Sequence, residues 1–147
     1  MRNTILIIVL SLVFFSCNKD LSGTSPGLTF KSVNTTVVQP SQEIEFTLSF
    51  GDVNGNLDSL YIYSVSQTCP KAFSDSASIS YFPTFKNQAG TLLVTYLNGG
   101  GNGFQPTIND SCASGINDTC YFKFIIKDFS GKKSDTARSP QIVLIKP

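Results

Sequence analysis

Hydrophobic and polar residues alternate along several short stretches of the chain, and this period of two predicts β-strands with one buried face. The clearest run is 43–50, where phenylalanine and leucine alternate with glutamate, threonine and serine. A second run, 59–66, is rich in tyrosine, isoleucine and valine. The loop between them, 51–58, contains the glycine, aspartate and asparagine that turns favour. The pattern predicts a hairpin-like strand pair at the centre of the domain.

The same pattern, interrupted by turn residues, predicts further strands over 28–38, 91–97, 119–127 and 141–146. An irregular region, 68–86, is expected to hold one short strand near 78–82. No window shows a sustained helical period. About seven short strands separated by turns predict an all-β fold with two packed sheets.

The inward positions of these strands predict the hydrophobic core. The candidates are Phe46, Leu48, Phe50, Leu60, Ile62, Leu92, Val94, Phe122, Phe124, Ile126, Val143 and Ile145. Tyrosines occur at five positions of the chain. They are Tyr61, Tyr63, Tyr81, Tyr96 and Tyr121. An exposed aromatic face is one interpretation, and coverage of sheet edges and strand pairs is the one that β-sheets favour.

The N-terminal segment has the features of an export signal. An apolar run, 5–15, follows Arg2 and is too short to span a bilayer as an ordinary helix. It ends at Ser16 and Cys17, which resembles a bacterial lipoprotein signal, although Phe14 and Phe15 depart from the usual pattern. The resemblance implies a signal peptide over 1–16, an anchored tether over 17–27 that carries acyl chains such as palmitate on Cys17, and a domain over 28–147. A plain secretory signal with a coincidental cysteine is the alternative.

Two longer motifs resemble a group of uncharacterised lipoproteins of Bacteroidetes. They are FGDVNGNL at 50–57 and DTCYFKFIIKDFSGKKSD at 118–135. The resemblance implies an immunoglobulin-like β-sandwich attached to the outer membrane by its lipid. It implies no catalytic residues.

In such a sandwich, the loops at 51–58 and 128–135 lie at the same end. Oxygen ligands without histidine or cysteine suit Ca²⁺, so this end offers a candidate structural calcium site. Its candidate ligands are Asp52, Asn54, Asn56, Asp58 and Asp128. Their spacing does not match an EF-hand loop. The favoured interpretation is that these residues satisfy the backbone of their own turns.

Four cysteines occur in the chain. With Cys17 acylated, Cys69, Cys112 and Cys120 remain in an oxidising compartment, which predicts one disulfide and one thiol. The pair Cys112–Cys120, which closes a short loop, is favoured. Cys69 bonded to either of the others and an unpaired Cys69 are the alternatives.

Three short patterns resemble the O-glycosylation acceptors of exported Bacteroidetes proteins. The acceptor positions are Ser59, Ser76 and Thr136, each of which follows an aspartate and precedes an apolar residue. The segment 18–20 only partly resembles the signal that sends such lipoproteins to the cell surface, so both faces of the outer membrane stay open.

Charge and composition narrow the function. Without Arg2 in the signal, the chain has ten basic and ten acidic side chains, which gives no reason to expect nucleic acid as a partner. Histidine, the commonest general base, is absent from the sequence. We therefore expect a non-catalytic binding or accessory module in an outer-membrane protein complex. A cell-surface glycan-binding module, stabilised by calcium, is the alternative, and a hydrolase that uses Asp52 and Asp58 is a third hypothesis.

Overall fold

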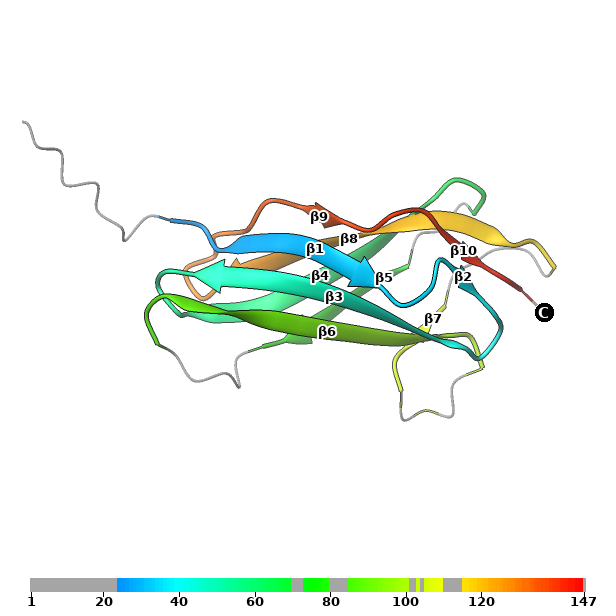
Figure 1. Cartoon of the computed structure of the whole chain (residues 1–147), viewed down its shortest axis with the longest axis horizontal. Coiled ribbons are helices and arrows are strands. Elements are labelled where there is room, and N and C mark those ends of the chain that lie inside the picture. The colour runs from blue at the N-terminus through cyan, green and yellow to red at the C-terminus, as the bar shows by residue number, and fades with distance from the viewer. Residues whose placement is uncertain are drawn as a thin grey trace, which may run out of the picture.

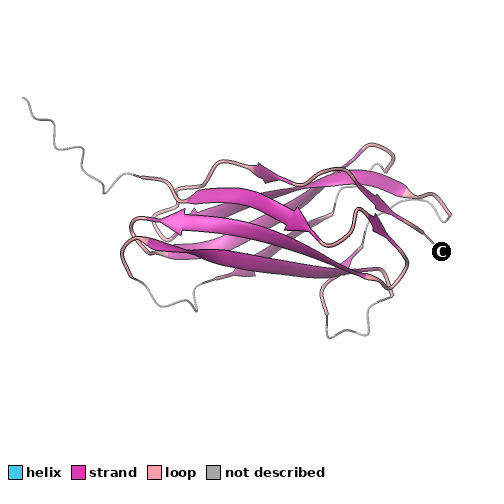
Figure 2. Cartoon of the chain, viewed as in Figure 1, coloured by secondary structure: helices cyan, strands magenta, loops and turns pink. Residues whose placement is uncertain are grey.

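Two β-sheets pack face to face in the computed structural model, which describes residues 24–69, 73–79, 85–100, 103, 105–109 and 115–146 (Figure 1). The first sheet, sheet A, has the order β1 (Gly27–Val33), β3 (Glu43–Asp52), β6 (Gln88–Asn98), β7 (Thr107–Ile108). The second, sheet B, has the order β2 (Val37–Val38), β10 (Ile142–Leu144), β8 (Asp118–Asp128), β4 (Leu57–Ser66), β5 (Ser74–Ser78), with β9 (Ala137–Arg138) also paired to β8. The described residues contain strands and loops and no helix (Figure 2). The predicted all-β two-sheet sandwich is confirmed.

The strand order is that of an immunoglobulin-like sandwich. The strands β1, β3 and β6 form one sheet, and β10, β8 and β4 form the other. The prediction that 43–50 and 59–66 form a hairpin-like pair is therefore wrong. Strand β3 pairs with β1 and β6, whereas β4 pairs with β8 and β5. Both strands have an apolar inner face, so β3 and β4 pack across the core instead of side by side.

The predicted strand 28–38 is split between the two sheets. Its first part, β1, pairs with β3 in sheet A, and its second part, β2, pairs in parallel with β10 in sheet B. Asn34 fixes the crossing, because its Nδ2 donates to the carbonyl of Glu43 at 3.3 Å and its Oδ1 accepts from the amide of Glu45 at 2.9 Å. One continuous segment thereby joins both layers.

The short strand expected near 78–82 lies earlier, at β5, and residues 80–84 are outside the described part of the chain. Strand β5 pairs with β4 over its full length. Its sequence, SDSAS, has no apolar alternation, so the pattern of the sequence alone gave no signal for it.

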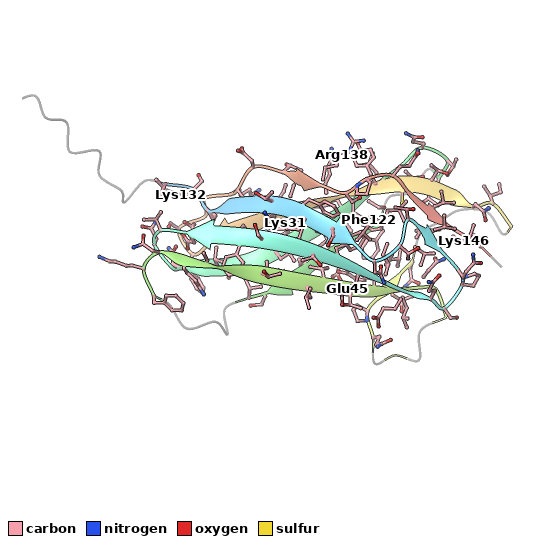
Figure 3. The ribbon with its side chains drawn as sticks, in the orientation of Figure 1. Lys31, Glu45, Phe122, Lys132, Arg138 and Lys146 are labelled. Carbon is pink, nitrogen blue, oxygen red and sulfur yellow. The ribbon has the colours of Figure 1, made fainter. Side chains whose placement is uncertain are left out.

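Phenylalanine rings from both sheets form the centre of the core. Phe46 of β3 lies 4.9 Å from Phe122 and 5.1 Å from Phe124 of β8, measured between ring centroids, and all three side chains are fully buried. Figure 3 labels Phe122 in the region between the two layers. Ten of the twelve predicted core residues are buried. These contacts hold the sheets face to face.

The prediction for the last strand is wrong by one residue. Val143 and Ile145 are only half-buried, whereas Ile142 and Leu144 are fully buried. Residues 142–145 are all apolar, so the sequence does not indicate which face is inward, and a shift of one residue exchanges the two faces.

Replacing Phe46 with alanine tests the role of the ring cluster. We expect Phe46→Ala to lower the free energy of unfolding by about 3–5 kcal/mol, because it leaves a cavity between the sheets. Ser49→Ala, on the outer face of the same strand, should change it by less than about 1 kcal/mol. Urea unfolding measures both values, and equal losses would contradict the assignment of the core.

Candidate functional site

The two loops rich in aspartate and asparagine meet at one end of the sandwich, as the sequence predicted. The amide of Phe129 donates to the carbonyl of Asn56 at 2.9 Å, and Asn56 Nδ2 donates to Ser130 Oγ at 3.4 Å. Gly27, where β1 begins, pairs with Gly51, so the chain enters the domain at this same end (Figure 1). We call this the entry end.

The buried carboxylates at the entry end bind the backbone of their own turns. Asp52 accepts from the amides of Asn54 at 3.1 Å and Asn56 at 2.7 Å. Asp128 accepts from the amide of Lys132 at 2.8 Å and from Ser130 Oγ at 3.1 Å. These bonds support the interpretation that both residues are structural turn residues.

The other candidate calcium ligands do not form a cluster of metal ligands with these two aspartates in the described residues. Asp58 forms an ion pair with Lys127, whose Nζ lies 3.1 Å from Asp58 Oδ2. Asn56 contributes Oδ1, a buried oxygen without a hydrogen-bond partner in the structure. Within the described residues, no group of three or more histidine, cysteine or acidic side chains is placed to hold a metal ion. Calcium at the entry end stays a prediction.

The opposite end contains a polar cluster that the sequence analysis missed. Asp118 is 1% exposed, and its Oδ1 accepts from Ser66 Oγ at 2.5 Å and from Thr68 Oγ1 at 3.0 Å. Ser66 Oγ in turn accepts from the amides of Thr68 and Cys69. The second oxygen of Asp118, Oδ2, is buried without a hydrogen-bond partner. In the sequence, the indication of this cluster is an acidic residue, Asp118, at the start of a strand with a buried face.

The cysteines favour one of the alternatives from the sequence. Cys69 takes part in a disulfide, and Cys120 is a buried thiol. This arrangement favours a bond from Cys69 to another cysteine over the pair Cys112–Cys120. Cys112 itself, like the lipidation candidate Cys17, lies outside the described residues.

The three glycosylation candidates differ in accessibility. Ser76 in β5 and Thr136 before β9 are exposed, whereas Ser59 in β4 is half-buried. Modification at these positions stays a prediction.

The outer face of sheet B carries tyrosines and cations in contact with one another. We call it the cationic–aromatic face and define it by Tyr61, Tyr63, Tyr121, Lys123, Lys127 and Arg138. The strand register creates it, because β4 and β8 point alternate residues inward to the core and outward to solvent. Arg138, which comes from β9, completes it from a distant part of the sequence (Figure 3).

Cation–π contacts order this face. The guanidinium carbon of Arg138 lies 3.4 Å from the ring centroid of Tyr121, and Lys123 Nζ lies 5.7 Å from the same centroid. Lys127 Nζ lies 5.7 Å from the ring centroid of Tyr61. The hydrogen bond to Asp58, with a smaller contribution from Tyr61, raises the pKa of Lys127. The face therefore presents rigid aromatic rings with a net positive charge.

A shallow hollow of about 300 Å³ lies beside this face, between β4 and β5. We call it the tyrosine hollow, and its lining residues are Tyr61, Tyr63, Ser74, Asp75 and Ser76. Of the remaining tyrosines, Tyr121 lies on the same side of sheet B, whereas Tyr81 is outside the described residues.

Tyr96 does not belong to the exposed aromatic face. It is buried, and its hydroxyl donates to Asp75 Oδ2 at 2.8 Å. Burial, followed by the hydrogen bond and charge of Asp75, raises the pKa of Tyr96 above its ordinary value of 10.0.

Comparisons with known proteins find similarity among solved structures alone. Neither protein-family models nor curated proteins match the chain. Among solved structures, the sporulation control protein Spo0M of Bacillus subtilis is 8% identical over 82% of this chain and 49% of its own, with a TM-score of 0.46. A late embryogenesis abundant (LEA) protein is 10% identical over 99% of this chain and 86% of its own, with a TM-score of 0.40. This chain spans about half the length of Spo0M.

The described residues also contain no helix long and apolar enough to cross a membrane.

The raised pKa of Tyr96 predicts a loss of stability in alkali. Above about pH 10 the unfolded chain releases the phenolic proton while the folded protein keeps it, so the free energy of unfolding falls by up to about 1.4 kcal/mol per pH unit. We expect Tyr96→Phe to remove this fall of the free energy of unfolding with pH. At neutral pH the same variant should lower the free energy of unfolding by about 1 kcal/mol. Denaturant unfolding at several alkaline pH values measures the slope. Tyr63→Phe, on the exposed face, is the control that should leave it unchanged.

The turn role of Asp128 gives a second prediction. Asp128→Ala should lower the free energy of unfolding by about 1–3 kcal/mol, because the Lys132 amide and the Ser130 hydroxyl lose their acceptor. We expect the same loss in excess Ca²⁺ and in chelator. A loss that appears only when Ca²⁺ is present would show instead that the entry end binds the ion.

Proposed function

We propose that this protein is a non-catalytic binding module, anchored to the outer membrane through a lipid on Cys17, that recognises a protein partner with its cationic–aromatic face. The observation that carries the proposal is the contact of Arg138 and Lys123 with the ring of Tyr121 on an outward sheet surface. We expect the partner to be a subunit of an outer-membrane assembly.

The chemistry of the face suits a protein surface. Tyrosine and arginine are the residues in which binding energy concentrates at protein interfaces. Tyrosine rings contribute a large contact area at a low cost in conformational entropy. Because Asp58 neutralises Lys127, the uncompensated cations of the face are Lys123 and Arg138, which favour an acidic patch on the partner.

The position of the tether supports access to a neighbour in the membrane. The chain enters the domain at Gly27, at one end of the sandwich (Figure 1). A tether of about ten residues spans at most about 35 Å when extended. We expect the long axis of the domain to extend away from the membrane, which would turn the cationic–aromatic face toward neighbouring membrane proteins.

The candidate carboxylates support a non-catalytic role. Asp52 accepts two amides of its own turn, and Asp58 is paired with Lys127. A hydrolase with these two residues as acid and base would first have to break these interactions.

The tyrosine hollow favours glycan binding as a second candidate function. Its two aromatic rings lie beside the hydroxyl and carboxylate groups of β5, which combines an apolar surface with hydrogen-bonding groups. A polysaccharide that binds there would lose affinity on Tyr63→Ala.

A pull-down of the lipidated protein from its native membrane, with the double variant Lys123→Glu and Arg138→Glu, tests the proposal. We expect the unmodified protein to recover a companion in stoichiometric amount and the double variant to bind it at least about tenfold more weakly. The matched control is Lys31→Glu with Lys86→Glu, which makes the same charge change at exposed positions outside the face.

Recovery of the companion by the double variant would contradict the proposal, and so would recovery of the protein alone. If polysaccharide binding is then found and is lost on Tyr63→Ala, the second candidate replaces the first.

A further inference from the structure

Strand β6 has an open edge. It pairs with β3 along its whole length, but on its other side it pairs only with β7, at Leu97 and Asn98. Over Gln88–Tyr96, no strand among the described residues pairs with this side.

The backbone groups at this edge can be assigned from the neighbouring hydrogen bonds. The amide of Leu97 donates to Pro106 on the open side at 3.0 Å, whereas the amide of Asn98 donates to Gln42 on the β3 side. Antiparallel strands alternate the direction of these groups, and β6 keeps its register with β3 throughout. The amides and carbonyls of Thr91, Leu93 and Thr95 therefore point out of the open edge.

This edge lacks the usual protection. Natural sheets protect edge strands with charges, prolines, bulges or short length. Strand β6 has eleven residues, none of them charged and none of them proline, and Leu93 is 63% exposed. The other edges in the described part differ, because β1 is irregular at Lys31, β5 is short and contains Asp75, and β2 has two residues.

A cavity of about 410 Å³ lies beside the open edge, between β6 and the β4–β5 pair. Leu60, Ile62, Leu92 and Val94 supply apolar lining. Ala77 of β5 also lines it and is exposed, although its register partner Leu60 faces the core. Sheet B thus extends one strand beyond β6. Tyr96 of β6 reaches β5 through its hydrogen bond to Asp75, but no strand in the described part of sheet A lies opposite β5. In constant-type immunoglobulin sandwiches a fourth strand occupies this place.

We propose that the open edge of β6 accepts an extended segment of a partner protein as an added strand, with alternate apolar side chains of that segment in the cavity. The added strand satisfies the outward backbone groups of Thr91, Leu93 and Thr95 and covers the inner face of β5. Asp75 at the cavity favours a basic residue in the segment. The site is separate from the cationic–aromatic face and does not depend on it.

Other occupants satisfy only part of this site. A second copy that pairs through its own β6 brings Leu92, Val94 and Tyr96, which are already buried in its own core and leave the cavity unfilled. A fatty acid fills the cavity but leaves the edge amides without partners, and its carboxylate meets Asp75.

The probe is a fluorescent octapeptide that alternates valine and threonine between terminal lysines, added to the full chain in detergent. Fluorescence anisotropy should show binding at least about tenfold tighter than that of a control peptide with threonine at every valine position. Leu93→Pro removes one edge amide and leaves the hydrogen bonds to β3 intact, so it should weaken octapeptide binding about tenfold. Leu93→Ala keeps the amide and should change the affinity by less than about twofold.

A second variant tests the cavity. Ala77→Phe fills it and should weaken octapeptide binding about tenfold, whereas Ala77→Ser should not. Thermal unfolding checks that each variant is folded. The double variant Lys123→Glu with Arg138→Glu should bind the octapeptide normally, which separates this proposal from the proposed function.

Several outcomes would overturn the proposal. Absence of octapeptide binding is one, and binding unaffected by both Leu93→Pro and Ala77→Phe is another. Slow hydrogen exchange at Thr91, Leu93 and Thr95 in the free protein would show that the chain covers its own edge. A dimer that Leu93→Pro dissociates would assign the edge to a second copy, and a co-purified lipid lost on Ala77→Phe would assign the cavity to an acyl chain.

Discussion

The packing of Phe46 against Phe122 and Phe124 is the contact on which the rest of the structure depends, because it fixes which face of each central strand is inside. With these rings buried, alternation along β4 and β8 turns tyrosines and lysines outward. A shift of one residue in β8 would bury its lysines, and a shift of one residue in β4 would bury its tyrosines, and either shift would expose core residues. The outward positions of the tyrosines and lysines in the cationic–aromatic face therefore follow from the burial of the core residues in the same strands.

The two ends of the sandwich have different chemistry. At the entry end, buried carboxylates bind their own turns, and Asp52 and Asp128 close the loops where the tether arrives. At the opposite end, Asp118 binds the hydroxyls of Ser66 and Thr68 next to the disulfide-bonded Cys69. The bonds of Asp52 and Asp128 at the entry end lie within single turns, whereas those of Asp118 join segments about 50 residues apart in the chain. The sheet surfaces and the open edge of β6 are then the parts that we propose for interactions with other molecules.

Strands with strict alternation, such as β3 and β8, could be predicted from the sequence, because only one assignment buries their phenylalanines. The split of 28–38 could not, since the crossing depends on tertiary hydrogen bonds from Asn34 to β3. The turn roles of Asp52 and Asp128 could also be predicted, because aspartate side chains accept hydrogen bonds from backbone amides a few residues away. Arg138 was not, because its stacking on Tyr121 requires the pairing of β9 with β8, which no pattern in the sequence indicates.

Recognition of a protein partner by the cationic–aromatic face can be measured with a photo-crosslinking amino acid at Tyr63, in the lipidated protein in its native membrane. We expect one defined protein adduct from Tyr63, on the cationic–aromatic face, and none from the same amino acid at Lys31 on sheet A. Adducts from both positions, or from neither, would contradict the claim that this face recognises a specific protein partner.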